Sequence, residues 1–282
     1  MDKIKATVGI VGAGSMGGAI ARGLVASGAM DASDVFACDP SADKLAALAE
    51  LGIGGFASAE ELVDAGTDVV VLAVKPQVLP EVAGGLSDKL VGRLVVSIAA
   101  GVTLSTLADY LDGARVIRVM PNLLIQVLSG ATAIAPGQAA TPADVELVRG
   151  LFSALGCAQV MREDQLDAEG AVVSCGPAYL ALFVDTLTRA GIRAGLPAQA
   201  CREMVEMTML GVGKALLESG EHPRAYMEKV TSPGGTTAAG LLALEPHLLE
   251  GSYGAVDAAL ARTRELAGAE GRGDGWSRSP TS

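Results

Sequence analysis

Short apolar runs alternate with amphipathic stretches over the first half of the chain. Five runs are almost wholly apolar, as strands buried on both faces of a sheet are, and they cover residues 7–11, 35–38, 68–74, 94–98 and 115–120. A sixth run, at 131–135, has the same texture. Helical patterns lie between several of these runs. Strands that alternate with helices predict a parallel, doubly wound sheet, and therefore an α/β fold.

The pattern changes after about residue 163. Long helical patterns then follow, separated by turn sequences at Gly176-Pro177, Gly195-Leu196-Pro197 and Ser232–Gly235. We therefore expect a sheet domain at 1–163, an all-helical domain at 164–267 and a disordered tail at 268–282. The helical domain is apolar for its size, which predicts that it buries surface against a second copy of itself.

Composition narrows the classes of function. The chain has 282 residues, half of them apolar, which indicates a folded protein with one or two domains. The net charge of -11 argues against nucleic acid or an anionic membrane surface as a partner. No apolar run reaches the roughly 18 residues that a membrane helix requires, and no signal peptide is expected. Four separated cysteines and two histidines predict reduced thiols in a cytoplasm and no metal site.

A glycine-rich turn directly follows the first predicted strand and opens the first helix. Its glycines are Gly12, Gly14 and Gly17, and Asp39 ends the second strand about 20 positions further on. This context predicts a dinucleotide site with the pyrophosphate at the helix N-terminus. Asp39 would accept a hydrogen bond from the ribose 2′-hydroxyl and repel a 2′-phosphate. NADH is therefore favoured, while Lys44 keeps NADPH open.

The remaining strand ends meet the same edge of the sheet, where ligands lie in such folds. Lys75 could reach cofactor phosphate or be an ordinary surface lysine, and the small residues 99–101 would let a nicotinamide ring lie against the backbone. Asn122 could orient the carboxamide or a substrate group. The predicted cofactor set is Gly12, Ala13, Gly14, Ser15, Met16, Gly17, Asp39, Val74, Lys75, Pro76, Ala99, Ala100, Gly101 and Asn122.

One loop in the helical half concentrates hydrogen-bond donors. It is the string Val230–Thr237, in which two adjacent glycines free the backbone to turn N–H groups toward one point. A helical pattern resumes at Ala238, and a helix N-terminus favours an anion. The string predicts a pocket for a small carboxylate; the alternative is an ordinary helix–helix turn with a Thr N-cap.

Five motifs, taken in order, resemble the 1-pyrroline-5-carboxylate reductase family. They are Gly12–Met16, Ala73–Pro76, Arg118–Asn122, Gly176–Tyr179 and Val230–Thr237, and the resemblance covers about residues 5–267. It implies a Rossmann domain followed by a helical dimerisation domain, in a homodimer or larger homo-oligomer whose active site is shared between subunits. It also implies reduction of the cyclic imine 1-pyrroline-5-carboxylate to L-proline with NAD(P)H.

The resemblance also implies roles for individual residues. The Ser232 hydroxyl and the N–H groups of residues 234–236 would hold the substrate carboxylate, and Thr237 would be the catalytic residue that hydrogen-bonds the ring nitrogen. No residue is an obvious general acid, so the proton is expected from water or from an iminium already protonated. The predicted substrate set is Ser232, Gly234, Gly235, Thr236, Thr237, Asn122 and Cys175. For Cys175 the alternative is a small buried packing thiol.

Several positions near the expected pocket depart from the family pattern. Leu123–Ile125 replaces the usual Thr-Pro-Ala, Cys175 replaces a serine, and Ala181 stands where an aromatic residue is common. These changes leave open a substituted pyrroline-carboxylate or a six-membered piperideine-carboxylate as the substrate.

Three other classes of protein remain as rivals. A β-hydroxyacid dehydrogenase needs a lysine on the first helix after the nucleotide domain, and residues 164–213 contain none. An imine reductase for amines without a carboxylate would have no anion for the loop at 230–237. A non-catalytic relative would be marked by a broken cofactor turn, whereas all three glycines of the turn are present.

Overall fold

The computed structural model describes residues 3–270. Contacts between Cα atoms divide the chain into two compact units: unit 1 holds the residues up to Ser174 and those from Leu260 on, and unit 2 runs from Cys175 to Ala259. This division lies later in the chain than the predicted boundary at residue 163. Of the predicted tail, residues 268–270 are helical, and residues 271–282 lie outside the described part of the chain.

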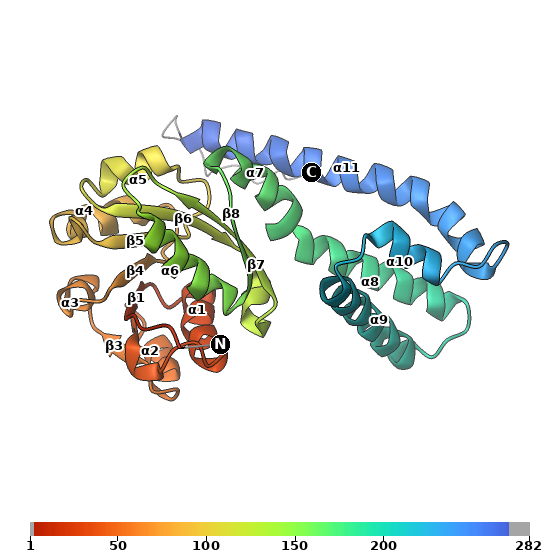
Figure 1. Ribbon diagram of the computed structural model, residues 1–282, viewed down its shortest axis with the longest axis horizontal. Coiled ribbons are helices and arrows are strands. Elements are labelled where there is room, and N and C mark those ends of the chain that lie inside the picture. The colour runs from red at the N-terminus through yellow and green to blue at the C-terminus, as the bar shows by residue number, and fades with distance from the viewer. Residues whose placement is uncertain (1–2, 271–282) are drawn as a thin grey trace, which may run out of the picture. The chain divides into compact units, whose positions relative to one another are not determined.

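An eight-stranded sheet forms the centre of unit 1 (Figure 1). Its spatial order is β3-β2-β1-β4-β5-β6-β7-β8, and neighbouring strands are parallel except for the antiparallel pair β6–β7. The strands are β1 (Val8–Val11), β2 (Val35–Cys38), β3 (Gly54–Phe56), β4 (Val69–Leu72), β5 (Leu94–Ser97), β6 (Arg115–Pro121), β7 (Gly130–Pro136) and β8 (Gly156–Val160). The predicted α/β class is confirmed.

Two strands have no counterpart in the sequence prediction. β3 contains two glycines in three residues, so it lacks the apolar side chains by which a strand is recognised. β8 lies at the edge of the sheet and buries only Ala158, so it shows no apolar run. Both strands sit at the outer edges, where burial is incomplete.

Helices cover both faces of the sheet, because strand side chains alternate between two cores. Val8 and Ile10 of β1 enter the core covered by α1 and α6, whereas Val11 enters the core covered by α3, α4 and α5. The helices and turns of unit 1 before residue 175 are α1 (Ser15–Ala26), η1 (Ala32–Asp34), α2 (Ala42–Ala49), α3 (Ala59–Asp64), α4 (Leu79–Leu90), α5 (Leu104–Tyr110), η2 (Leu123–Val127), α6 (Pro142–Ser153), η3 (Glu163–Gln165), α7 (Leu166–Glu169) and the π-helical turn η4 (Gly170–Ser174).

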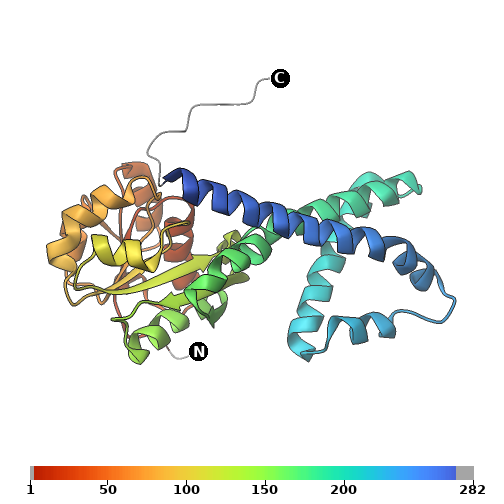
Figure 2. The same cartoon turned by 90° about the horizontal axis from the view of Figure 1, so that it is seen from above.

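Unit 2 is built from helices, which Figure 2 shows in colours from green through cyan to blue. They are α8 (Gly176–Arg193), α9 (Ala198–Ser219), α10 (Pro223–Lys229) and the first part of α11 (Thr236–Glu270). Helices α8 and α9 meet closely, because a Cβ built on Gly191 would lie 2.5 Å from the Cys201 sulfur. Thr188 and Cys201 are the only buried residues among those described in this unit.

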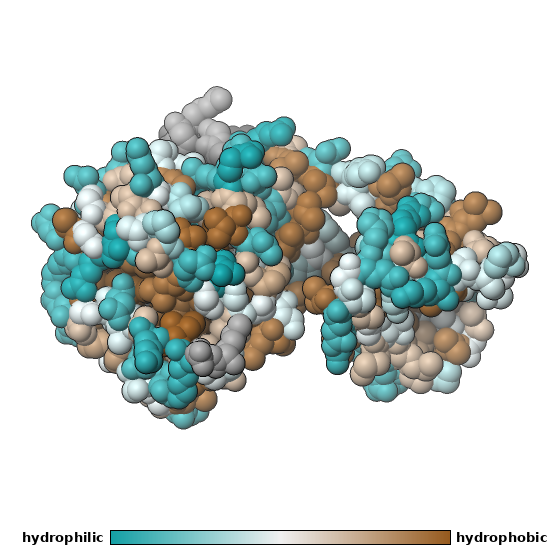
Figure 3. All heavy atoms as spheres, viewed as in Figure 1, coloured by the Kyte–Doolittle hydropathy of each residue, from teal (hydrophilic) through white to brown (hydrophobic). Residues whose placement is uncertain are grey.

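The helices of unit 2 leave many large apolar side chains exposed. Leu217 and Leu242 are 84% and 80% exposed, and Figure 3 shows brown side chains scattered over the visible face of these helices. Others that are exposed include Leu180, Leu182, Met204, Met207, Leu210 and Tyr253. An apolar surface of this extent is typical of a helical unit that packs against a partner.

One helical stretch among the described residues, 163–193, is long and apolar enough to cross a membrane by length and composition alone. The expectation that no segment reaches this length was therefore wrong by this measure. The stretch has no unbroken apolar run of this length, because Gly, Ser, Cys and Thr occur within it. Its mean hydropathy is nevertheless 1.4. Core helices of soluble proteins pass the same test when they are mostly buried, whereas 6% of this window is buried in the structure.

Asp144 ties α6 to the sheet. Its Oδ2 accepts hydrogen bonds from the Thr141 backbone N–H at 2.8 Å and from the Thr141 hydroxyl at 2.6 Å, which closes a capping box at the start of α6. Its Oδ1 accepts from Arg115 Nη1 at 2.7 Å. Asp144 is buried, so its loss would leave these donors without an acceptor.

We expect Asp144→Ala to lower the free energy of unfolding by about 3 kcal/mol, because one cap and one partly buried ion pair are lost together. Urea denaturation measures this change. Glu146→Ala is the matched control, since Glu146 pairs with Arg149 on the exposed side of the same helix. Equal losses in the two variants would contradict this account of α6.

Candidate functional site

The glycine turn after β1 leaves an open helix N-terminus. Gly12 has φ +101°, and a Cβ built there would lie 2.8 Å from the Ala73 carbonyl oxygen. A Cβ on Gly17 would lie 1.9 Å from the Gly12 oxygen, so only glycine allows α1 to approach the strand this closely. Around Gly14 an added Cβ would meet nothing within 4 Å, and Gly14 caps α1 without a side chain. The turn therefore fits a diphosphate, which needs free N–H groups and open space.

Asp39 organises this turn from the end of β2. Its Oδ2 accepts from the Ala13 N–H at 2.9 Å, and its Oδ1 accepts from the Ser41 N–H at 2.9 Å. Lys44 Nζ lies 3.0 Å and 3.1 Å from the two carboxylate oxygens. Burial acts to raise the pKa of Asp39, but these hydrogen bonds and the Lys44 charge outweigh it and lower the pKa. Lys44 thus offsets part of the charge that would discriminate against a 2′-phosphate.

A hollow of about 250 Å³ lies at the ends of β5 and β6. The structure brings four predicted cofactor residues together on its wall: Met16, Ala99, Ala100 and Asn122. Residues 74–76 and Gly101 are not part of this wall. Lys75 is exposed on the loop between β4 and α4.

Asn122 is buried and its side chain is engaged by protein partners. Its Oδ1 accepts from the N–H groups of Leu124 and Ala131, both at 3.2 Å, and its Nδ2 donates to the Val173 carbonyl oxygen at 3.3 Å. Through the bond to Val173, Asn122 connects the end of β6 to the turn η4. Asn122 was expected to orient the nicotinamide carboxamide or a substrate group, and in the structure these three bonds orient its amide toward the protein.

Among the lining residues outside the predicted site set, two have polar side chains, Arg118 and Ser174. Arg118 is buried, and its Nη1 lies 3.1 Å from Glu163 Oε1, which also accepts from the Leu104 N–H at 2.6 Å. The signal for Arg118 is a charged residue with apolar neighbours on both sides within the strand at 115–120. Ser174 has no comparable signal, because its position depends on the π-helical turn η4.

The donor loop of unit 2 turns at Gly234, which has φ +70°. The Gly235 N–H donates to the Ser232 carbonyl oxygen at 3.0 Å, so this N–H closes the turn and is not free for a ligand. The N–H groups of Gly234 and Thr236 have no partner among the described residues. Ser232, Gly234, Thr236 and Thr237 are all exposed, and α11 begins at Thr236.

Cys175 precedes α8 and is exposed, which corrects the alternative of a buried packing thiol. It lies beside Tyr179 one turn later. Burial raises the pKa of Tyr179, and the Cys175 thiol raises it further. Cys175 belongs to unit 2 with the donor loop, whereas every predicted cofactor residue belongs to unit 1.

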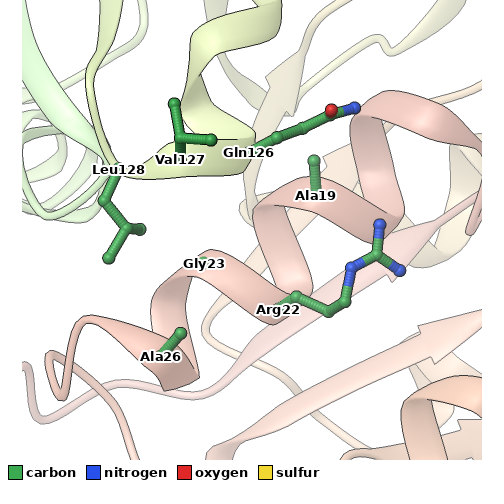
Figure 4. A pocket seen from close by; sticks show the side chains of 7 residues that line it. All are labelled: Ala19, Arg22, Gly23, Ala26, Gln126, Val127 and Leu128. Atoms are coloured by element: carbon green, nitrogen blue, oxygen red, sulfur yellow. The ribbon is translucent and has the colours of Figure 1, made fainter. Parts of the chain in front are cut away.

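A larger hollow of about 500 Å³ lies between α1 and η2 (Figure 4). Its wall consists of Ala19, Arg22, Gly23, Ala26, Gln126, Val127 and Leu128. None of the predicted site residues lines it, so it is separate from the glycine turn and from the hollow at β5 and β6.

Comparison with known families assigns both halves of the chain. Residues 163–266 match the family model described as pyrroline-5-carboxylate reductase dimerisation. Residues 7–101 match the model described as NADP oxidoreductase, coenzyme F420-dependent. The apolar helices of unit 2 thus fall within a match to a dimerisation domain.

Individual relatives agree over nearly the whole chain. The pyrroline-5-carboxylate reductase of Methanosarcina acetivorans is 36% identical over 263 residues, which cover 92% of this chain and 97% of the relative. The solved pyrroline-5-carboxylate reductase of Coxiella burnetii has a TM-score of 0.89 and 31% identity, over 93% of this chain and 98% of its own. That of Plasmodium falciparum with NADP bound has a TM-score of 0.80 and 26% identity, over 94% and 99%. The chain belongs to the pyrroline-5-carboxylate reductase family.

Proposed function

We propose that this protein reduces the C=N bond of 1-pyrroline-5-carboxylate to give L-proline, with NADH or NADPH as the reductant. The observation that carries the proposal is the exposed loop at 230–237, because a glycine turn alone would suit many dehydrogenases. Gly234 and Thr236 offer unpaired N–H groups there, beside the Ser232 and Thr237 hydroxyls. Such a cluster suits the carboxylate of a small imino acid.

In this proposal different residues bind the nucleotide and the substrate. The open N-terminus of α1 and Asp39 would hold the nucleotide, which supplies the hydride when bound. The Ser232 hydroxyl and the N–H groups of Gly234 and Thr236 bind the substrate carboxylate and so orient the ring. The Thr237 hydroxyl hydrogen-bonds the ring nitrogen. Hydride transfer to C=N depends on this orientation more than on an activated nucleophile.

We further propose that the active protein is a cytoplasmic homodimer or a larger homo-oligomer. The exposed apolar side chains of unit 2 supply the surface for a second copy, and residues 163–266 match the dimerisation model. In such a dimer the donor loop of one subunit meets the nicotinamide held by the other. The four free cysteines suit a reducing compartment.

A second candidate substrate is a substituted pyrroline-carboxylate or a six-membered piperideine-carboxylate. It is favoured by Leu123, which lines the hollow at β5 and β6 in place of a smaller polar residue. A non-catalytic relative is disfavoured, because the glycine turn keeps the geometry that binds a diphosphate.

A substrate panel tests the proposed reaction. Oxidation of NADH and NADPH is followed with 1-pyrroline-5-carboxylate, a methylated pyrroline-carboxylate, a piperideine-carboxylate and 1-pyrroline without a carboxylate. We expect the highest kcat/KM with 1-pyrroline-5-carboxylate and none with 1-pyrroline. Preference for a larger ring would establish the second candidate, and tight nucleotide binding without any turnover would contradict both.

The carboxylate of Asp39 leads us to expect a preference for NADH over NADPH. The wild type should show the higher kcat/KM with NADH, and Lys44→Ala should increase that preference about five-fold, because it removes the cation that offsets Asp39. Lys89→Ala is the control, since Lys89 pairs with Asp64 away from the turn. A wild type that works markedly better with NADPH would overturn this assignment.

Thr237→Ala should lower kcat about a hundred-fold, the loss expected when one donor to a reacting centre is removed. The melting temperature should stay nearly the same, because Thr237 is exposed at the first turn of α11. Thr208→Ala on α9 is the matched control, with the same substitution at another exposed helical threonine. Full activity of Thr237→Ala would remove Thr237 from the mechanism.

A further inference from the structure

A half-buried carboxyl group is hydrogen-bonded to a residue that lines the hollow at β5 and β6. Glu169 is the last residue of α7, where the chain enters the π-helical turn η4. Its Oε1 is buried and has no hydrogen-bond partner among the described residues. Its Oε2 accepts a hydrogen bond from the Ser174 hydroxyl at 3.3 Å. An unpaired buried oxygen costs more free energy on a charged carboxylate than on a protonated, neutral carboxyl.

The π-helical turn η4, which follows Glu169 in the chain, packs against strand β6 of the sheet. A Cβ built on Gly170 would lie 3.3 Å from the sulfur and the methyl carbon of Met120, so β6 and η4 are in close contact. Asn122 holds the other end of the turn through the Val173 carbonyl. π-helical turns of this kind recur at functional sites, because they reposition a few side chains without ending the helix.

The surroundings of Glu169 favour its protonated form near neutral pH. Burial raises its pKa to about 7, and the Ser174 hydrogen bond opposes the rise only in part. No charged neighbour contributes to the shift. The charged groups on the elements packed against it are Glu163 and Asp164 of η3, Asp167 of α7, and Arg115 and Arg118 of β6.

Ser174 connects this carboxyl to the hollow. It lines the wall that also contains Met16, Ala99 and Asn122, at the sheet edge where ligands of such folds lie. Ser174 therefore contacts Glu169 through its hydroxyl and is itself part of the wall of the hollow. When Glu169 carries its proton on Oε2, the hydrogen bond can reverse, with Glu169 donating and Ser174 free to donate into the hollow.

We propose that Glu169, acting through the Ser174 hydroxyl, supplies the proton that the substrate nitrogen takes up; this rests on the proposed imine reduction. The carboxyl proton passes from Glu169 Oε2 to Ser174 Oγ as the Ser174 proton passes to the ring nitrogen. The lone pair of that nitrogen forms the new N–H bond and gives an iminium, whose N–H then donates a hydrogen bond to the Thr237 hydroxyl oxygen. Its carbon then accepts the hydride, and solvent returns a proton to the Glu169 carboxylate. Glu169 thus acts through Ser174 and does not contact the substrate, whereas the Ser174 hydroxyl contacts the ring nitrogen directly.

The test compares the wild type with Glu169→Gln across pH 5.5 to 9, with the same cyclic imino acid throughout. The ratio of their kcat/KM values cancels the ionisation of the substrate itself. We expect the wild type to be about a hundred-fold faster at pH 6, the usual contribution of a general acid. The ratio should then fall about ten-fold per pH unit above pH 7. Ser174→Ala should remove the same pH dependence.

A second readout needs no substrate. The folded-state pKa of Glu169 is raised above its value in the unfolded chain, so the protonated group stabilises the fold at low pH and this contribution is lost as the pH rises through about 7. The melting temperature of Glu169→Gln, relative to the wild type, should therefore increase between pH 5 and pH 8. Asp167→Asn, on the exposed side of the same short helix, should show no such trend.

These readouts separate the two hypotheses. A wild type that turns over imino acids while Glu169→Gln keeps its rate and pH profile would overturn the proton role and leave the reaction standing. A wild type that turns over no cyclic imino acid would overturn both. A pH-independent difference in melting temperature would show that Glu169 does not hold a proton near pH 7, which also contradicts the proposal.

Discussion

Helices α8 to α11 carry large apolar side chains that find no interior within unit 2. Thr188 and Cys201 are the only buried residues among those described there, whereas the sheet of unit 1 has a core on each face. Obligate dimer interfaces bury on the order of 2,000 Å² or more of this kind of surface. The donor loop at 230–237 lies in the same unit. Assembly and catalysis are therefore expected to depend on each other.

Within unit 1 the chemistry follows from backbone geometry at one edge of the sheet. Gly12 and Gly17 let α1 begin close to β1, and Asp39 holds the turn between them through Ala13. At the neighbouring strand ends, Asn122 fixes the segment that carries Ser174. These bonds orient the site before any ligand enters, which lowers the entropy cost of bringing reactants together.

Sequence patterns predicted the six inner strands, the helical second half and the glycine turn, because burial on both faces leaves an unbroken apolar signature. They did not predict β3 and β8, which lie at the sheet edges. They also did not predict how buried polar groups are paired. The engagement of Asn122 by Val173, the use of the Gly235 N–H within its own turn and the burial of Glu169 all depend on contacts that form only after folding.

The central claim is that this chain transfers a hydride from a nicotinamide to a ring carbon of a cyclic imino acid. The most direct measurement uses nicotinamide nucleotide deuterated at the transferring position, with 1-pyrroline-5-carboxylate, and analyses the product by mass spectrometry and NMR. We expect L-proline carrying one deuterium, on the ring carbon that was part of the C=N bond. Unlabelled proline, or no proline despite nucleotide binding, would contradict it.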